Sequence, residues 1–369
     1  MAVGGAPFFR PETFDALAGW RDDAPSAAYS AFRRSAFRAL EKPYRTGSLG
    51  VEAASFAGAF AEARQVEALD DCGARSFFER HFRPFLIEPD SGAGLVTGFY
   101  EPQAEASPVR TGRFVYPIYG RPDDLVDIDD ANRPAGMDRY LAFGRRTADG
   151  AIEEYHDRRA IERGALAGRG LEIAWLADRV DLFFIHVQGA ARLVMPDGAV
   201  RRVTYAAKSG HRFTGAGRVL IGRGELPQAG VTMQSIRAWF RENPGRIDEI
   251  LHENRSFIFF RDAPVDDAGL GPVAAAKVPL TAGRSMAVDR LLHTFATPFF
   301  VEAPSLDAFG TSGFRRLMIA QDTGSAIVGP ARGDLFTGSG HAAGEIAGVI
   351  NHPAAFHILI PLPVAERFT

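Results

Sequence analysis

A chain of 369 residues, 46% of them apolar and 24% charged, is long enough to form two globular domains with a core in each. Its 42 basic and 45 acidic residues give a net charge of −3, which argues against a nucleic-acid partner and favours a neutral or mixed-charge polymer. The single cysteine excludes an intramolecular disulfide and a cysteine-based metal site.

The chain shows no targeting or membrane segment. Its first residues, MAVGGAPFFRPETF, lack a basic region followed by an apolar stretch, so we expect no signal peptide within them. No uninterrupted apolar run approaches the roughly 18 residues that a membrane span needs. Cys72 lies in a stretch of helical character, where we expect a small buried apolar residue rather than a nucleophile.

Helices are predicted for the first part of the chain. Segment 25–42 repeats its aromatic and alanine residues at near-helical spacing, and Pro43 ends the pattern. Segments 50–66 and 72–82 carry a similar amphipathic pattern. We therefore expect a helical opening that packs its apolar faces on the rest of the protein.

The pattern changes to strands at Gly94. Pro196-Asp197-Gly198 separates two short apolar runs, which predicts a β-hairpin. A short helix is expected at 156–167. The stretch 94–107 is strand-like, and Pro102 ends a strand within it. We predict a β-rich block between 104 and 214, with strands at 113–120, 171–175, 182–188, 193–195 and 200–205.

The last third begins with helices and continues as short strands. Thr232 is a suitable N-cap for a helix that Pro244 stops, and a second helix follows at 246–254. Many short strands separated by Gly and Pro favour a small closed barrel over an open parallel sheet. These strands are predicted at 257–261, 278–280, 285–288, 298–301, 317–321, 335–336 and 356–360.

The candidate chemistry concentrates in residues 317–342. Asp322 and Asp334 each lie at the end of a short apolar run, with Gly-rich turns between them, so we expect neighbouring strands that meet at one place. A carboxyl group with a raised pKa can protonate a glycosidic oxygen, and hydrolases add a second carboxylate. On these residues alone either aspartate could be the acid. Asp289, in MAVDRLL, is more simply explained as a turn cap or ion-pair partner.

Other chemistries find less support. Asp322-Thr323-Gly324-Ser325 matches the D-T-G-S of aspartic proteases, whose only candidate second loop here is Asp90-Ser91-Gly92. No His-x-x-x-His pair, G-x-S-x-G elbow or phosphate loop occurs, so we expect no metal and no cofactor. Tyr100 and Gln188 suit sugar recognition, although a packing role is equally reasonable for Tyr100.

Several stretches taken together resemble the membrane-bound lytic murein transglycosylase A family. They follow the family's order and span nearly the whole chain: TGFYEP (97–102), HVQGAARL (186–193), TMQSIRAWF (232–240), NRSFIFFR (254–261), VPLTAGRSMAVDR (278–290) and LMIAQDTGSAIVGPARGDLFTGSG (317–340).

The resemblance implies a mainly β fold with flanking helices. Residues 1–103 and 215–369 would form a double-psi β-barrel domain with N-terminal helices, including a three-aspartate module at about 278–362. Residues 104–214 would form an inserted, barrel-like β domain, with a groove between the two.

The resemblance also implies cleavage of the β-1,4 bond between N-acetylmuramic acid and N-acetylglucosamine without water, leaving a 1,6-anhydromuramoyl end. By position Asp334 matches the family's catalytic acid, which then acts as the base, and Asp322 matches a supporting groove aspartate. Substrate contacts are expected from the matched motifs, at Gly98, Tyr100, Glu101, Gln188, Gly189, Ala190, Asp289, Thr323 and Gly324.

Three departures from the family pattern affect fine specificity more than reaction class. Ala190-Ala191 replaces Ser-Gly, His341 replaces an aspartate, and 291–296 replaces a Pro/Gly-rich turn. The resemblance further implies a periplasmic or outer-membrane-associated monomer acting on peptidoglycan strands, with cell-wall synthesis or division proteins as candidate partners. An aspartic protease and a non-catalytic peptidoglycan-binding barrel remain the alternatives.

Overall fold

The computed structural model describes residues 8–89, 92–264, 267–310 and 312–369, and contacts between residues divide the chain into two units. The first unit comprises Met1–Tyr100 and Asp267–Thr369, and the second comprises Glu101–Asp266. The boundary at 214 inferred from sequence therefore falls inside the second unit. The helices and the strand that follow residue 214 belong to the same compact body as the β-rich block.

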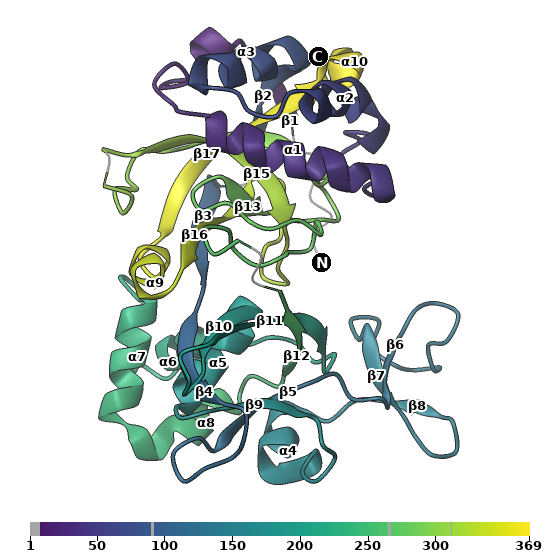
Figure 1. Ribbon diagram of the computed structural model, residues 1–369, viewed down its shortest axis with the longest axis vertical. Coiled ribbons are helices and arrows are strands. Elements are labelled where there is room, and N and C mark those ends of the chain that lie inside the picture. Colours follow the sequence, from purple (N-terminus) through teal and green to yellow (C-terminus); the bar gives the residue numbers. More distant parts are fainter. Residues whose placement is uncertain (1–7, 90–91, 265–266, 311) are drawn as a thin grey trace. The chain divides into compact units, whose positions relative to one another are not determined.

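The first unit is built on an eight-stranded sheet in the order β1-β2-β17-β14-β15-β13-β16-β3 (Figure 1). A further pairing of β17 with β3 closes the run from β17 to β3 into a ring. Sequence patterns had indicated the core strands but not β1 and β2. The bounds are β1 (Phe8–Pro11), β2 (Phe82–Glu88), β3 (Gly94–Glu101), β13 (Ser285–Ala287), β14 (Pro298–Ala303), β15 (Phe314–Asp322), β16 (Arg332–Ser339) and β17 (Asn351–Pro361).

Helices accompany this sheet, and the three predicted in the opening segment are confirmed. The carboxylate of Asp70 accepts the N–H of Gly73 at 2.7 Å, which caps the third of them. Cys72, expected to be buried, is exposed because it lies on the outer face of that helix. The helices are η1 (Phe14–Ala16), α1 (Ser26–Glu41), η2 (Ala53–Phe56), α2 (Ala57–Gln65), α3 (Asp71–His81), α9 (His341–Ala347), α10 (Leu362–Ala365) and η5 (Glu366–Phe368).

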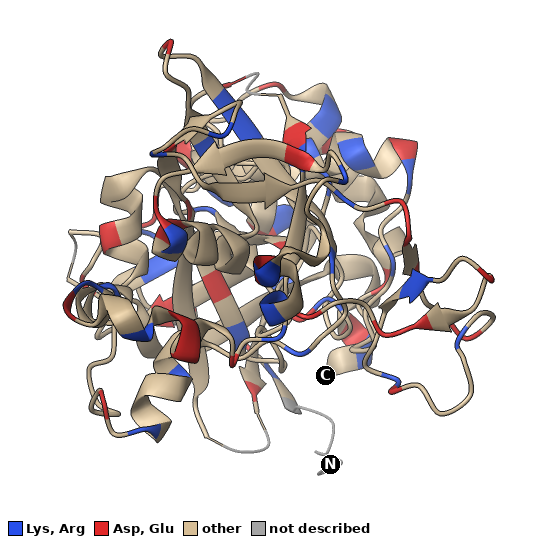
Figure 2. Cartoon of the chain, turned by 90° about the horizontal axis from the view of Figure 1, so that it is seen from below, with Lys and Arg blue, Asp and Glu red and all other residues tan. Residues whose placement is uncertain are grey.

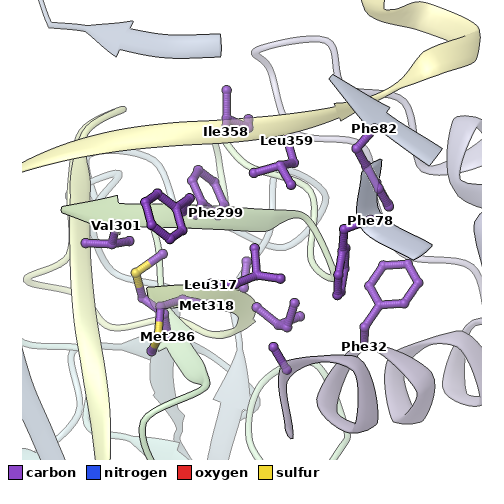
Figure 3. Close-up of a cluster of buried hydrophobic side chains, with 14 of the residues drawn as sticks. Phe32, Phe78, Phe82, Met286, Phe299, Val301, Leu317, Met318, Ile358 and Leu359 are labelled. Carbon is purple, nitrogen blue, oxygen red and sulfur yellow. The ribbon is translucent and has the colours of Figure 1, made fainter. Parts of the chain in front are cut away.

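One large apolar core joins the opening helices to the strands (Figure 3). Phe32 of α1 and Phe78 of α3 meet at a ring-centroid distance of 5.8 Å, and both are fully buried. Met286, Leu317 and Ile358 come from three strands and are also fully buried or nearly so. The helical opening is therefore part of the scaffold that fixes the strands.

The second unit contains a six-stranded sheet in the order β12-β11-β10-β4-β9-β5 and a three-stranded sheet, β6-β7-β8, that the sequence patterns did not predict. The predicted hairpin is confirmed as the antiparallel pair β10 and β11. A bridge between Gly120 and Phe260 joins the two ends of the larger sheet. The strands are β4 (Gln103–Ser107), β5 (Tyr116–Tyr119), β6 (Leu125–Asp127), β7 (Phe143–Arg146), β8 (Ile152–Glu153), β9 (Glu172–Leu176), β10 (Ala190–Val194), β11 (Val200–Lys208) and β12 (Ile258–Ala263).

The prediction of a strand at 182–188 is wrong, because the segment lies in helix α5. A short, wholly apolar run does not distinguish a buried strand from a buried helix. The helix is defined by Asp178, whose carboxylate accepts two N–H groups at its start, and by Gly189, whose φ of 76° ends it. The predicted strand at 278–280 is also wrong, since that stretch contributes only a bridge between Val273 and Pro279.

The helix that starts after Thr232 is confirmed together with its cap. Thr232 and Ser235 form a reciprocal capping box, each side chain accepting the other's backbone N–H. The helices of this unit are α4 (Arg158–Ala160), η3 (Ile161–Ala165), α5 (Arg179–Gln188), α6 (Ala216–Gly222), α7 (Met233–Glu242), η4 (Pro244–Arg246) and α8 (Ile247–Leu251).

Lys and Arg residues and Asp and Glu residues are both scattered over the chain (Figure 2). Within the described ranges no helix is long and apolar enough to cross a membrane. The same part of the chain contains no group of three or more His, Cys, Asp or Glu side chains that could hold a metal ion.

Candidate active site

Strand pairing brings the two candidate acids to the same place in the first unit. Strand β13 lies between β15 and β16. Its residue Ala287 is opposite Asp322 on one side, in a parallel pair, and opposite Asp334 on the other, in an antiparallel pair. The two acids lie in the same region, as predicted, but their strands are not neighbours because β13 lies between them.

Successive side chains of β16 point alternately toward the apolar core and toward the site. Gly333 faces the main core, where a Cβ would lie 2.4 Å from the sulfur of Met286. Because successive side chains point to opposite faces, Arg332 and Asp334 share the other face. The R-G-D sequence thus places a cation and an acid side by side, with the one residue that fits the core between them.

The face that carries Asp334 has its own small apolar cluster. Its members are buried and come from three strands and two loops of the first unit: Phe99, Leu280, Ala287, Ile327 and Phe336. Apolar surroundings deprive a carboxylate of the water that stabilises its charge. The cluster is the local cause of the pKa shifts of the two acids.

Asp334 is half-buried and makes one side-chain hydrogen bond. Thr97, on the neighbouring strand β3, donates its hydroxyl to Oδ1 at 2.5 Å. Arg332 in turn donates to the Thr97 hydroxyl oxygen at 2.7 Å. Burial raises the pKa of Asp334, and the Thr97 hydrogen bond and the Arg332 charge offset only part of that rise. The site therefore favours a proton on this carboxyl group.

Asp322 is held differently, by backbone groups. Ala275 donates its N–H to Oδ1 at 3.1 Å. Burial raises the pKa of Asp322 to about 6, and the Asp334 charge adds to the rise. The N–H groups of Thr323 and Ala275 and the charge of Lys277 act in the opposite direction. The charge of Asp334 therefore makes ionisation of Asp322 less favourable.

The geometry does not provide an aspartic-protease dyad. Strands in a sheet lie about 4.8 Å apart, so Cα atoms on either side of β13 are roughly 10 Å apart. Within the described residues no hydrogen bond joins the carboxyl groups of Asp322 and Asp334, whereas the protease pair shares one proton at contact distance. The candidate second loop at 90–92 lies largely outside the described residues.

Asp289 links two loops beside the acids. Its carboxylate accepts the N–H of Leu291 and the N–H of Gly329, each at 3.0 Å. His293 strengthens the same connection by a 2.8 Å hydrogen bond to the carbonyl oxygen of Pro330. The second loop joins β15 to β16, so this contact holds the segment that runs from Asp322 to Asp334. The turn-capping explanation of Asp289 agrees with this arrangement, and contact with substrate stays a prediction.

Gly98 and Tyr100, expected to touch substrate, both pack against the segment around α9. A Cβ on Gly98 would lie 2.7 Å from Ile350 and 2.9 Å from the backbone of Ala347. Tyr100 is 6% exposed, and a Cβ on Gly344 would lie 2.8 Å from its ring. These contacts explain the residue types by packing alone.

Glu101 belongs to the second unit and is fully buried. Its carboxylate accepts from Arg192 at 2.8 Å and from Arg202 at 2.6 Å, two residues that face each other across β10 and β11. The arrangement is a buried ion cluster that fixes the start of β4 against the hairpin. The ion cluster alone explains why a glutamate occupies this position, and direct contact between Glu101 and substrate stays a prediction.

The remaining predicted contacts lie at element ends. Gln188 is the last residue of α5, Gly189 is its left-handed cap and Ala190 begins β10. In the first unit, Thr323 and Gly324 form the turn after Asp322, and Gly324 is exposed.

Thr97 and Arg332 are the site residues that sequence reasoning missed. The sequence signal for Arg332 was its place two residues before Asp334 in a strand, which puts both on one face. Thr97 gave no such signal, since its contact with Asp334 depends on the pairing of β3 with β16 across more than two hundred residues.

Family comparisons cover both units. A family model described as the MltA specific insert domain matches residues 95–261, and one described as the 3D domain matches residues 284–360. The membrane-bound lytic murein transglycosylase A of Escherichia coli K12 is 32% identical over 277 residues, which are 73% of this chain and 66% of that protein. The aligned part thus spans just under two thirds of that relative.

Two solved structures extend the similarity to nearly the whole chain. A membrane-bound lytic murein transglycosylase from Agrobacterium tumefaciens is 50% identical, with a TM-score of 0.93 over 98% of this chain and 100% of that one. The E. coli MltA structure with bound chitohexaose is 26% identical, with a TM-score of 0.68 over 97% and 96% of the two chains.

Proposed function

This chain belongs to the membrane-bound lytic murein transglycosylase A family, and we propose that it cleaves peptidoglycan glycan strands with Asp334 as the only acid and base. Enzymes of this family are peptidoglycan-cleaving lyases. The observation that carries the assignment of Asp334 is its place on an apolar face, where burial raises its pKa. A carboxyl group whose pKa is raised by its surroundings is suited to act as a general acid.

The first step is protonation of the leaving group. The carboxyl O–H bond of Asp334 breaks and its proton goes to the glycosidic oxygen. The bond between that oxygen and C1 of N-acetylmuramic acid breaks, and its electron pair stays with the leaving oxygen. Positive charge then develops at C1 and the ring oxygen, as in other glycosidic cleavages.

The second step returns the proton. The C6 hydroxyl of the same sugar attacks C1, its O–H bond breaks, and the proton goes to the carboxylate of Asp334. The nucleophile is already attached to the substrate, and an oriented intramolecular nucleophile has a large rate advantage over free water. One carboxylate therefore suffices where hydrolases use two.

Asp322 supports this chemistry through its charge. Its raised pKa of about 6 leaves it largely ionised near neutral pH. A negative charge across β13 from Asp334 disfavours loss of the Asp334 proton before substrate binds, and it stabilises the positive charge that develops at C1.

The proposal also covers the type of β-barrel, the extent of the sugar-binding site and the cellular location of the protein. The strands that close into a ring in the first unit are assigned as a double-psi β-barrel. The bound chitohexaose of the E. coli structure supports an extended sugar-binding site. We assign the protein to the periplasm or the outer membrane as a monomer, in keeping with the membrane-bound relatives.

Digestion of purified sacculi, followed by mass spectrometry of the soluble products, tests the proposed reaction. Muropeptides with 1,6-anhydromuramoyl ends are expected. Reducing muramoyl ends would indicate a hydrolase, cleaved peptide stems a protease, and binding without products a non-catalytic protein. Each of these three outcomes would overturn the proposal.

A further inference from the structure

Asp334 has two carboxyl oxygens, and the structure treats them differently. Oδ1 accepts the Thr97 hydroxyl at 2.5 Å, and within the described residues no hydrogen bond is made to Oδ2. Thr97 is half-buried on β3, opposite Asn351 in the ladder with β17, so its backbone is fixed by strand pairing. The contact therefore joins two strands of the ring and does not depend on a mobile loop.

Arg332 decides the direction of the Thr97 hydrogen bond. A guanidinium group can only donate, and a threonine hydroxyl has a single proton. Arg332 donates to the Thr97 oxygen at 2.7 Å, which occupies a lone pair of that oxygen. The hydroxyl proton is then directed to Asp334, and Oδ1 acts as an acceptor in both protonation states of the carboxyl group.

We propose that Thr97, oriented by Arg332, reserves Oδ1 of Asp334 as an acceptor, so that Oδ2 alone carries the proton delivered to the leaving oxygen and recovered from the C6 hydroxyl. Thr97 and Arg332 are thus positioning residues for the acid. The inference rests on the function proposed above and adds to it the identity of the oxygen and of the groups that select it.

The hydrogen bonds from Arg332 to Thr97 and from Thr97 to Asp334, which we call the relay, also limit how far burial raises the pKa of Asp334. The hydrogen bond from Thr97 and the nearby positive charge both stabilise the carboxylate that must exist between the two steps. The charged groups facing Asp334 are Arg332 on its own strand and Asp322 on β15. Strand β13 contributes the uncharged Ala287, and β3 contributes the uncharged Thr97.

Helix α9 also packs on β16. Its ionisable side chains, His341 and Glu345, are 90% and 54% exposed. They therefore face solvent and do not compete with Arg332 for the environment of Asp334.

The pH dependence of kcat measured with solubilised sacculi tests the proposal. Thr97→Val keeps the shape of the side chain but removes the hydroxyl. It should lower kcat by about 10-fold, the cost of one hydrogen bond to a charged group, with KM little changed. The alkaline limb, where the acid loses its proton, should move to higher pH because the carboxylate has lost a stabilising donor. Arg332→Met should move the limb in the same direction.

Two further variants separate this role from general loosening of the sheet. Thr97→Ser restores the donor and should return the alkaline limb to that of the parent chain. Thr337→Val makes the same substitution in β16, where the hydroxyl donates to the carbonyl of Ala343 at 2.9 Å and does not contact Asp334. It should leave the limb unmoved.

An alkaline limb that is the same in Thr97→Val and the parent chain would overturn the proposal, as would a failure of Thr97→Ser to restore it. Asp334→Asn keeps this result distinct from failure of the function itself. If Asp334→Asn is inactive while Thr97→Val has the parent profile, only the relay is wrong. If Asp334→Asn is active, the assignment of the acid is wrong.

Discussion

The second unit fully buries the carboxylate of Glu101 and the first unit half-buries that of Asp334, and the two carboxylates have different partners. Glu101 in the second unit is fully buried and bound by Arg192 and Arg202, so its charge is compensated. Asp334 in the first unit accepts one hydrogen bond, from the Thr97 hydroxyl, and the charge of Arg332 offsets only part of the effect of burial. Burial with compensation produces a structural ion cluster, whereas burial without it produces an acid that holds a proton. The cations and donors around a carboxylate, more than its burial, therefore distinguish a structural carboxylate from one suited to acid catalysis.

The largest effect should come from Asp334→Asn, which removes the proton without changing the shape of the side chain. We expect formation of anhydromuropeptides to fall by about 10³-fold or more, because general acid–base catalysis commonly contributes 10²- to 10⁴-fold and this group serves twice. Mass spectrometry of digested sacculi measures the products. Binding of the variant to sacculi should persist, and undiminished product formation would transfer the role of acid to Asp322.

Glu101→Gln should have its effect on stability instead. The substitution leaves two arginines, 14% and 4% exposed, without a counter-charge, and breaking a buried ion cluster in this way costs about 3 kcal/mol. Urea unfolding followed by hydrogen exchange in β10 and β11 measures the loss. The control is Glu105→Gln, in which the lost partner Arg113 is 64% exposed, and which should cost no more than about 0.5 kcal/mol. Equal costs for the two variants would contradict the distinction.

Asp322→Asn tests the stability cost of an uncompensated acid. The unfolded pKa is 3.8 and the folded pKa is about 6, so the parent chain loses stability as pH rises between those values. This pKa difference corresponds to a loss of about 2–3 kcal/mol in unfolding free energy. The asparagine variant does not show this loss because its amide does not ionise. Relative to the parent, the variant should therefore gain stability between about pH 4 and pH 7 while its activity falls. Urea unfolding at both pH values measures this, and parallel profiles would contradict it.

Sequence reasoning located the acids but not the groups that set their properties. Asp322 and Asp334 were predictable because each ends or begins an apolar strand, a local signal. Thr97 was not predictable, because its contact depends on long-range strand register. Glu101 lay in the motif expected at the substrate, and nothing local indicates that two arginines of a hairpin enclose it.

The same limit explains the errors in the fold. The apolar run 182–188 was compatible with a buried strand and a buried helix, and the cap at Asp178 and the stop at Gly189 decided for α5. The opening helices and the capped helix after Thr232 were predictable because their period and end signals are contained in the segments themselves.

Asp289 sharpens the comparison as an intermediate case, since its carboxylate is satisfied by two backbone N–H groups and not by a cation. Asp289→Asn offers one acceptor oxygen and places an amide donor against the second N–H, so we expect a loss of about 1–2 kcal/mol in unfolding free energy. Activity should fall moderately because the loop from Asp322 to Asp334 loosens. The alkaline limb should not move, because no charge facing Asp334 changes. A loss of glycan affinity at unchanged stability would instead place Asp289 at the substrate, and would assign a binding role to a carboxylate whose hydrogen bonds are all made within the fold.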